Sequence, residues 1–182
     1  MDKTEAILIG RLRHTESTLI VRWCSPDEGL FSTIAKGALR PKSPFIGQLD
    51  LFVGVDLRFV RSRRSEIHTL AEVRWQTPRL GLRGSYGRVL AATYLVKLIE
   101  LVVEPHAPIP GTYDLLKKAL DYLADHDPTV TLIERFENRL AEELGIGHSG
   151  GGAIAIEQAF HRRLPVQRQQ AIDWIRNRKA GQ

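Results

Sequence analysis

Hydrophobic and polar residues alternate with a period of two through the first 75 residues, which is the pattern of strands buried on one face. Five segments carry it: Glu5–His14, Thr18–Ser25, Leu30–Gly37, Leu51–Phe59 and Ile67–Trp75. Turn-forming residues separate these segments, among them a proline and a glycine within residues 25–29. Five short strands joined as hairpins predict a small closed barrel or sandwich, best matched by the OB type, although the alternation also allows an SH3-like barrel.

The period becomes helical after residue 84. Ser85 is placed to cap the first helix, and Pro105 is placed to end it. This helix is hydrophobic on nearly every face, so we expect it at the centre of the helical half. The predicted helices are Tyr86–Glu104, Tyr113–Ala124, Thr131–Leu144 and Ile154–Arg178, the last one interrupted near Pro165. The sequence therefore predicts an α+β chain of two domains, an OB-type barrel at residues 1–80 and an all-α helical domain at 81–182.

The composition is that of an ordinary globular protein, with 43% hydrophobic and 26% charged residues in 182. Cys24 is the only cysteine, which excludes a disulfide within the chain and any CxxC pair. No hydrophobic run is long enough to span a membrane, and the first residues lack a signal-peptide pattern. We expect a soluble, cytoplasmic protein without a membrane partner.

Positive charge is concentrated in the first half of the chain. The net charge is +5, and residues 1–88 hold fifteen Lys and Arg against nine Asp and Glu, whereas residues 89–182 hold eleven against twelve. This asymmetry indicates that the barrel half meets a polyanion, and nucleic acid fits better than a membrane surface because no basic amphipathic helix lies there.

Eight cations are candidates for contacts with phosphate groups. Three follow the third strand in a loop that two prolines stiffen, and the others continue the alternation of the first and fourth strands or lie in the turn beyond the fourth. They are Lys36, Arg40, Lys42, Arg11, Arg13, Arg61, Arg63 and Arg64. Trp23, Phe31 and Phe45 are available as stacking surfaces for bases. The plainer interpretation is that these cations are solvated and that Trp23 belongs to the core.

We find no catalytic or metal-binding pattern. Gly147–Gly151 formally matches the G-x-S-x-G motif of hydrolases, but a helical segment precedes it where the motif needs a strand. The histidines are scattered without metal-ligand spacing, and the glycine run 147–152 lacks the GK[ST] ending of a phosphate loop. The sequence therefore predicts no catalytic residues, no metal and no cofactor, and a protein that is not an enzyme.

Four short motifs follow one another in the first half of the chain: Glu28-Gly29-Leu30 after a turn, the block Ala35–Arg40, Phe45-Ile46-Gly47 and Leu49–Phe52. In this order they resemble the start of the RecO family of bacterial DNA repair proteins. The segments "YLVKLIELVVE" and "RFENRLAEELGI" are similar to two helices of the same family. The likeness covers about residues 3–147, and its most specific part is the block that contains Ala35-Lys36-Gly37.

The resemblance implies an N-terminal OB-fold, a helical C-terminal domain, and binding of single- and double-stranded DNA. It also implies strand annealing in recombinational repair together with RecR, the single-stranded-DNA-binding protein and, indirectly, RecA, in the cytoplasm at the nucleoid. Lys36 and Arg40 take the basic DNA-contacting positions of the block. The candidates Arg61, Arg63 and Arg64 come from charge and spacing alone.

The chain departs from the family pattern at three points. Many relatives carry a four-cysteine zinc site in the helical domain, whereas this chain has "HSGGGAIAIEQAF" there, so no zinc is expected. Leu39-Arg40 stands where relatives often have two adjacent arginines. The chain also ends early, among the helices that hold the site for the tail of the single-stranded-DNA-binding protein, so no residues are assigned to that site.

Three alternatives remain at this point. The helical half could be the functional part, a scaffold for acidic protein tails, and the barrel would then be basic without a function in nucleic-acid binding. The barrel could bind RNA, or nucleic acid only non-specifically. Ser149 could be a hydrolytic nucleophile, which a serine-directed probe would test.

Overall fold

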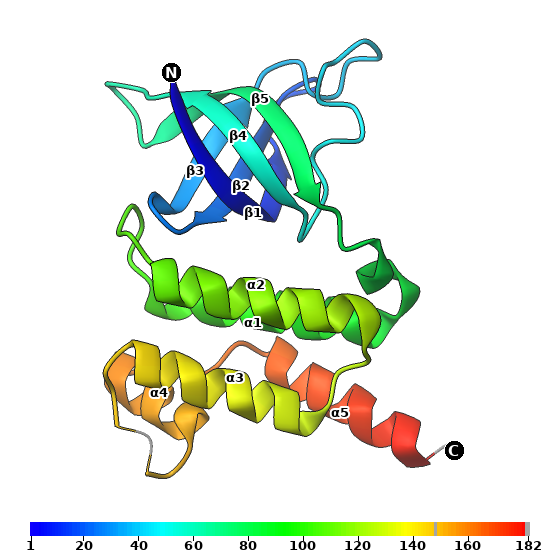
Figure 1. The fold of residues 1–182 in the computed structure, drawn as a ribbon, viewed down its shortest axis with the longest axis vertical. Coiled ribbons are helices and arrows are strands. Elements are labelled where there is room, and N and C mark those ends of the chain that lie inside the picture. Colours follow the sequence, from blue (N-terminus) through cyan, green and yellow to red (C-terminus); the bar gives the residue numbers. More distant parts are fainter. Residues whose placement is uncertain (148, 181–182) are drawn as a thin grey trace. The chain divides into compact units, whose positions relative to one another are not determined.

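The computed structural model describes residues 1–147 and 149–180, with strands followed by helices (Figure 1). The chain folds into two compact units. The first consists of Met1–Arg79 and Glu104–Tyr113, and the second consists of the rest of the chain. A short segment after the first long helix thus belongs with the strands.

Five strands close into a barrel: β1 (Asp2–Arg13), β2 (Leu19–Ser25), β3 (Gly29–Ala35), β4 (Gly54–Val60) and β5 (Ile67–Thr77). Their order around the barrel is β1-β2-β3-β5-β4, and only the β3–β5 pair is parallel. This is the OB-type topology, which confirms the predicted α+β class and the barrel. The expectation that every strand is joined as a hairpin was wrong, because β3 and β4 are not neighbours and the long connection 36–53 joins them.

The barrel core follows from the alternation. Side chains at every second position of β2 and β3 are buried, and Trp23 is fully enclosed. Its indole N–H donates to the Thr33 hydroxyl oxygen at 2.8 Å, so the one polar atom of this large side chain is satisfied inside the barrel. The Cys24 thiol is also buried.

The fourth strand is shorter than its alternation suggests. It begins at Gly54, whereas the sequence predicted a strand from Leu51. Leu51 is 39% exposed, and Phe52 is buried with φ of 67°, a left-handed conformation that no strand continues. The buried Arg79 guanidinium donates to the Phe52 carbonyl oxygen at 2.8 Å and thereby stabilises this turn.

The segment Glu104–Tyr113, which we call the strap, is attached to the barrel by backbone hydrogen bonds. The His106 N–H donates to the Leu30 carbonyl oxygen at 3.1 Å, and the Ile109 N–H donates to the Pro26 carbonyl oxygen at 2.8 Å. The strap is so close to the β2–β3 turn that a Cβ atom on Gly29 would lie 2.1 Å from the Ala107 carbonyl oxygen. Gly29 also has φ of 65°, so both space and backbone conformation favour glycine there.

The helices are α1 (Tyr86–Val102), α2 (Pro110–Asp125), α3 (Val130–Glu143), α4 (Gly152–Phe160) and α5 (Gln167–Ala180), preceded by the 3-10 turn η1 (Leu80–Gly84). As expected, α1 is the most buried helix, and it packs against α5. The predicted start at Tyr86 is confirmed, but the Ser85 side chain makes no capping hydrogen bond. None of the described helices is long and apolar enough to cross a membrane.

Two helix predictions need correction. The second helix begins at Pro110 and not at Tyr113, because proline is well suited to the first position of a helix, where its missing N–H would have no partner. The expected last helix begins at Gly152 and not at Ile154, whereas its predicted interruption near Pro165 is present: α4 ends before His161, which is left-handed with φ of 52°, and α5 begins after Pro165.

Candidate nucleic-acid interface

The strand register divides the candidate cations between two ends of the barrel. Leu19 pairs with both Arg13 and Ala35, so the β1–β2 turn lies beside the start of the β3–β4 connection. Because β3 and β5 run parallel, with Ser32 opposite Ile67, the β4–β5 turn lies at the other end, beside the start of β3. Figure 1 shows the β3–β4 connection and the β4–β5 turn on opposite sides of the barrel.

The first end, residues 11–18 and 36–50, is called the cationic end here. It carries five of the eight candidates, namely Arg11, Arg13, Lys36, Arg40 and Lys42, and all five are exposed. Against them stand only two carboxylates, Glu16 and Asp50. The structure thus brings these five cations together on one part of the barrel.

Two arginines of the cationic end also order its loops. One guanidinium N–H of Arg11 donates to the Leu49 carbonyl oxygen at 2.6 Å. Arg13 donates to the carbonyl oxygens of Thr15 and Glu16 at 3.3 and 3.2 Å. These are neutral acceptors, so both positive charges remain available to an anion.

The opposite end, called the balanced end here, holds acids in about the same number as its arginines. Three candidates, Arg61, Arg63 and Arg64, lie there with four acids, which are Asp2, Asp27, Glu28 and Glu66. Arg61 donates to the Glu28 and Asp2 carboxylates at 2.8 and 3.1 Å. The hydrogen bond that Arg61 donates to Glu28 is the main reason that the pKa of Arg61 is raised above its usual value. The structure therefore separates these three arginines from the other five.

His68 lies between the balanced end and the strap. Its ring stacks on Phe59 with the centroids 5.3 Å apart, and its Nδ1 accepts the Ser62 N–H at 3.5 Å. The buried Nε2 atom has no hydrogen-bond partner among the described residues. Burial lowers the pKa of His68, and the neighbouring Arg61 and His106 lower it further, which favours the neutral ring.

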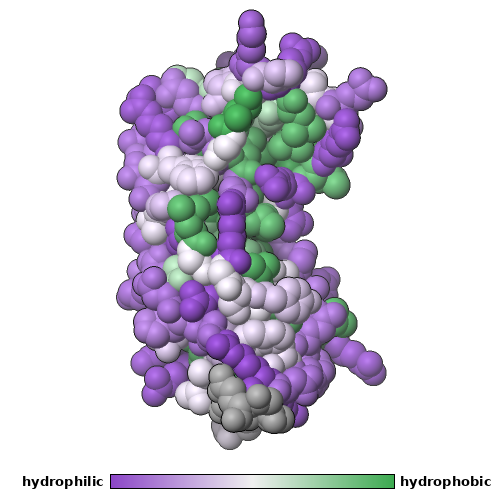
Figure 2. Space-filling model, turned by 90° about the vertical axis from the view of Figure 1, so that its right-hand side faces the viewer, coloured by the Kyte–Doolittle hydropathy of each residue, from purple (hydrophilic) through white to green (hydrophobic). Residues whose placement is uncertain are grey.

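The proposed stacking surfaces are not available. Trp23 is fully buried, Phe31 is 4% exposed and Phe45 is 8% exposed, so none of the three rings offers a face to a base. The plainer interpretation of Trp23 as a core residue was the better one. The exposed hydrophobic side chains of the cationic end are aliphatic instead, and Figure 2, which views this side of the barrel, shows hydrophobic surface between hydrophilic side chains. They are Leu12, Leu39 and Ile46, and the exposed Leu51 follows directly after this end.

Sequence reasoning missed one wall of the cationic end. Residues of the β1–β2 turn, including His14, Thr15 and Ser17, face Lys36 and Arg40 across a hollow of about 430 Å³. In the sequence these residues were only a polar break between two strands. Their contribution depends on the β1–β2–β3 register, which no local pattern reveals.

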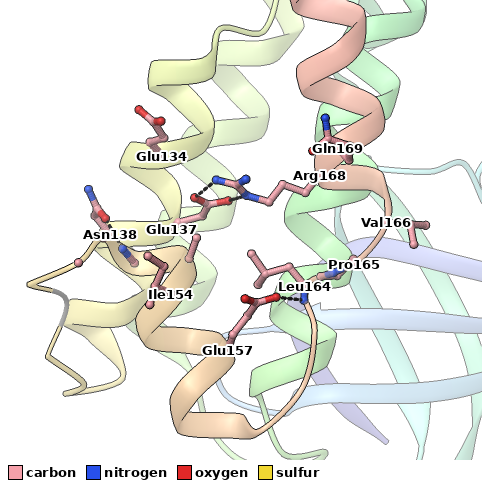
Figure 3. Close-up of a pocket in the computed structure, with 14 residues that line it drawn as sticks. Glu134, Glu137, Asn138, Ile154, Glu157, Leu164, Pro165, Val166, Arg168 and Gln169 are labelled. Atoms are coloured by element: carbon pink, nitrogen blue, oxygen red, sulfur yellow. Dashed lines mark hydrogen bonds and ion pairs between the residues drawn. The ribbon is translucent and has the colours of Figure 1, made fainter.

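A second cavity, of about 650 Å³, lies in the helical unit between α3, α4 and α5 (Figure 3). The nearly buried Glu137 accepts hydrogen bonds from Arg168 Nε and Nη2 at 2.6 and 3.0 Å and from the Tyr94 hydroxyl at 2.6 Å. Glu134 and Glu157 also line this cavity, and Glu157 accepts the Leu164 N–H at 2.9 Å. Arg168 is the only cation among the lining residues, and it forms an ion pair with Glu137. The lining of the cavity is therefore acidic.

The described residues contain no group of three His, Cys, Asp or Glu side chains that could hold a metal ion. Ser149 follows helix α3 through a turn, so the strand that a hydrolase serine elbow requires does not precede it. The neighbouring His148 of that motif lies outside the described residues.

Comparison with known proteins identifies both halves of the chain. The family described as Recombination protein O N terminal matches residues 1–79, and the family described as Recombination protein O C terminal matches residues 83–149. These segments correspond to the barrel and to the helices through α3.

Similar curated proteins carry the name DNA repair protein RecO. The relative from Nitrosospira multiformis is 29% identical over 77% of this chain and 56% of its own length. The relative from Tolumonas auensis is 28% identical over 89% of this chain and 68% of its own length, and that from Azoarcus sp. is 31% identical over 81% and 59%. The chain thus spans about half to two thirds of the length of these relatives. Both halves of the family match this chain in order, the first on the OB-type barrel and the second on the helices that follow it. The chain therefore belongs to the RecO family.

Proposed function

We propose that the barrel binds single- and double-stranded DNA through its cationic end and that the protein anneals DNA strands in recombinational repair. The observation that carries this proposal is the gathering of Arg11, Arg13, Lys36, Arg40 and Lys42 on one end of an OB-type barrel with only two acids among them. OB-folds commonly use such a charged face to follow a nucleic-acid backbone.

Charge explains how binding and annealing would proceed. Cations that neutralise phosphates release condensed counterions, which gives affinity without sequence preference. Two strands held close together on such a surface meet at a high local concentration, and the cations reduce their mutual repulsion. No covalent bond is made or broken, so the proposal requires neither catalytic residues nor a nucleotide cofactor, and the protein acts as a binding protein and not as an enzyme.

The repair role comes from the family. The relatives are named DNA repair proteins. The proposed partners are those that the family resemblance implies, namely RecR, the single-stranded-DNA-binding protein and, indirectly, RecA. The cavity of the helical unit is an unfavourable place for an acidic protein tail, because three glutamates line it and its single arginine is paired. We therefore assign no residues of this cavity to such a tail.

The first test is binding of single-stranded DNA at several salt concentrations. The triple variant Lys36→Ala/Arg40→Ala/Lys42→Ala is compared with the parent after its folding has been checked by circular dichroism. If these three side chains contact phosphates, affinity falls for every sequence. The slope of log K against log salt then shrinks by about 2, at roughly 0.7 per contact.

The opposite end of the barrel supplies a control of equal charge. The variant Arg61→Ala/Arg63→Ala/Arg64→Ala removes three positive charges from the balanced end, and we expect a clearly smaller loss of affinity and slope. Equal losses in the two triple variants would mean that net charge, and not the cationic end, governs binding. An RNA strand of the same sequence competes in the same assay, and preferential RNA binding would contradict the DNA repair role.

A second candidate function belongs to the helical unit. The cavity between α3, α4 and α5 is large enough for side chains of a peptide, and Ile154 and Val166 expose hydrophobic surface at it. In this alternative the helical unit is a protein-interaction scaffold and the basic barrel binds nucleic acid only non-specifically. It predicts that DNA binding disappears at physiological salt while binding to a protein partner persists.

A further inference from the structure

The cationic end contains a hollow between two turns that different strands provide. One wall is the β1–β2 turn, and the other is the end of β3 with the turn that follows it. The hollow has a volume of about 430 Å³, which is within the roughly 300–1,000 Å³ of small-molecule pockets and sufficient for one nucleotide. Its lining residues are His14, Thr15, Ser17, Thr18, Ile34, Lys36, Gly37 and Arg40.

Backbone hydrogen bonds hold the two walls in place. The Leu39 N–H donates to the Ser17 carbonyl oxygen at 3.0 Å and joins one turn to the other. Within the first turn, the His14 N–H donates to the Thr18 carbonyl oxygen at 2.9 Å, and Arg13 donates to two further carbonyl oxygens. In the second turn, the Arg40 N–H donates to the Gly37 carbonyl oxygen at 3.0 Å. The hollow is thus formed before any ligand arrives, which reduces the entropy lost on binding.

The chemistry of the lining matches a nucleotide. Lys36 and Arg40 supply positive charge on one wall, and the opposite wall supplies hydroxyl groups and the His14 imidazole, which can both donate and accept hydrogen bonds. Ile34 provides a half-buried apolar surface. None of the lining residues is acidic, so nothing in the hollow repels a phosphate group.

We propose that this hollow receives one unstacked nucleotide of a single strand, with its phosphate at Lys36 and Arg40 and its base against Ile34 and the β1–β2 turn. The proposal rests on the DNA binding proposed above. A base within a duplex is paired and stacked, and it enters a pocket only at the cost of breaking both interactions. The hollow therefore gives the cationic end a preference for single strands that charge alone does not provide.

The test compares two labelled strands in fluorescence anisotropy. One is a ten-residue oligothymidylate, and the other has the same length and the same phosphates but only abasic sites. We expect the protein to bind the strand with bases roughly fivefold more tightly, which corresponds to the burial of about 40 Å² of apolar surface between the base and an aliphatic side chain. Equal affinities would overturn the proposal and leave backbone binding intact. Failure to bind either strand would overturn the proposed function as well.

A variant locates the base contact. Ser17→Leu fills the hollow while keeping the backbone carbonyl that accepts the Leu39 N–H. We expect the ratio of its affinities for the strand with bases and the abasic strand to fall close to one, because the base can no longer enter the hollow. Ser65→Leu, the same change in the exposed β4–β5 turn, is expected to retain the preference of the parent. If Ser17→Leu, shown by circular dichroism to be folded, keeps the full preference, the base is bound elsewhere and the proposal is wrong.

Discussion

Arg168 donates two hydrogen bonds to Glu137, at 2.6 and 3.0 Å, and thereby joins α5 to α3 at a carboxylate that is 1% exposed. Tyr94 of α1 donates to the same carboxylate, so three helices meet at one charge. Burial and the neighbouring carboxylate raise the pKa of Tyr94 far above its usual value, which keeps its hydroxyl a donor. The Glu137–Arg168 pair stabilises the arrangement of α1, α3 and α5 around it.

Glu137→Gln is expected to destabilise the protein by about 2–3 kcal/mol. The substitution leaves the Arg168 guanidinium without its counter-charge, and breaking a buried pair costs about 3–5 kcal/mol, which the partial exposure of Arg168 reduces. Urea unfolding measures this difference. Glu134→Gln, an exposed position on the same helix, serves as the control and is expected to stay within about 0.5 kcal/mol of the parent. Equal stability of the two variants would show that the pair contributes nothing.

The contact between the strap and the β2–β3 turn is tested at Gly29. We expect Gly29→Ala to cost about 2–4 kcal/mol, because a Cβ atom there meets the Ala107 carbonyl oxygen at 2.1 Å and φ is 65°. The control is Gly47→Ala, where φ is 69° but nothing lies within 4 Å, so only the backbone cost of about 1–2 kcal/mol remains. Thermal unfolding of the two variants separates the contact from the backbone conformation. A loss of equal size in both would argue against a close strap.

His68 makes stability depend on pH in a defined direction. Its pKa is lowered in the folded protein, first by burial and then by Arg61 and His106, while Glu28 and Asp2 oppose the shift. The unfolded chain therefore binds the proton more readily than the folded one. The contribution of neutral His68 to stability is complete above the pKa of about 6.5 in the unfolded chain. It decreases as the pH falls through that value toward the lower pKa of the folded protein.

The variant His68→Phe removes this titration and keeps a ring against Phe59. We expect its free energy of unfolding to change less than that of the parent between pH 7.5 and 5. A steeper loss of stability in His68→Phe than in the parent would mean that the protonated ring is favoured in the folded state.

Much of the fold could be predicted because its causes are local. Alternation with a period of two marks the half-buried strands, and the change of period after residue 84 marks the helices. The start of β4 was wrong because Leu51 and Val53 keep the alternation while Phe52, between them, adopts a left-handed conformation. The parallel β3–β5 pair was also missed, since pairing between distant strands leaves no mark in a local pattern.

The candidate site could be predicted only in part for the same reason. The cations could be identified from the sequence but their neighbours could not, so the hydrogen bonds of Arg61 to Asp2 and Glu28 were not predicted. Conversely, Ser17 carries no charge and no motif. It joins the site only because the strand register places its turn opposite Lys36.

Single substitutions within the β3–β4 connection are expected to have unequal effects. Lys36 and Arg40 line the hollow, whereas Lys42 is also exposed but does not line it. Each of the three alanine substitutions removes one positive charge. A purely electrostatic surface therefore loses similar affinity for single-stranded DNA in all three variants. If Lys36 and Arg40 hold the phosphate of a bound nucleotide, Lys36→Ala and Arg40→Ala weaken binding severalfold more than Lys42→Ala, because charge-assisted hydrogen bonds to a phosphate are stronger than the attraction of a cation without such a contact. Anisotropy titrations of the three variants at the same salt concentration measure the ratio, and three equal losses would identify a diffuse field in place of a site.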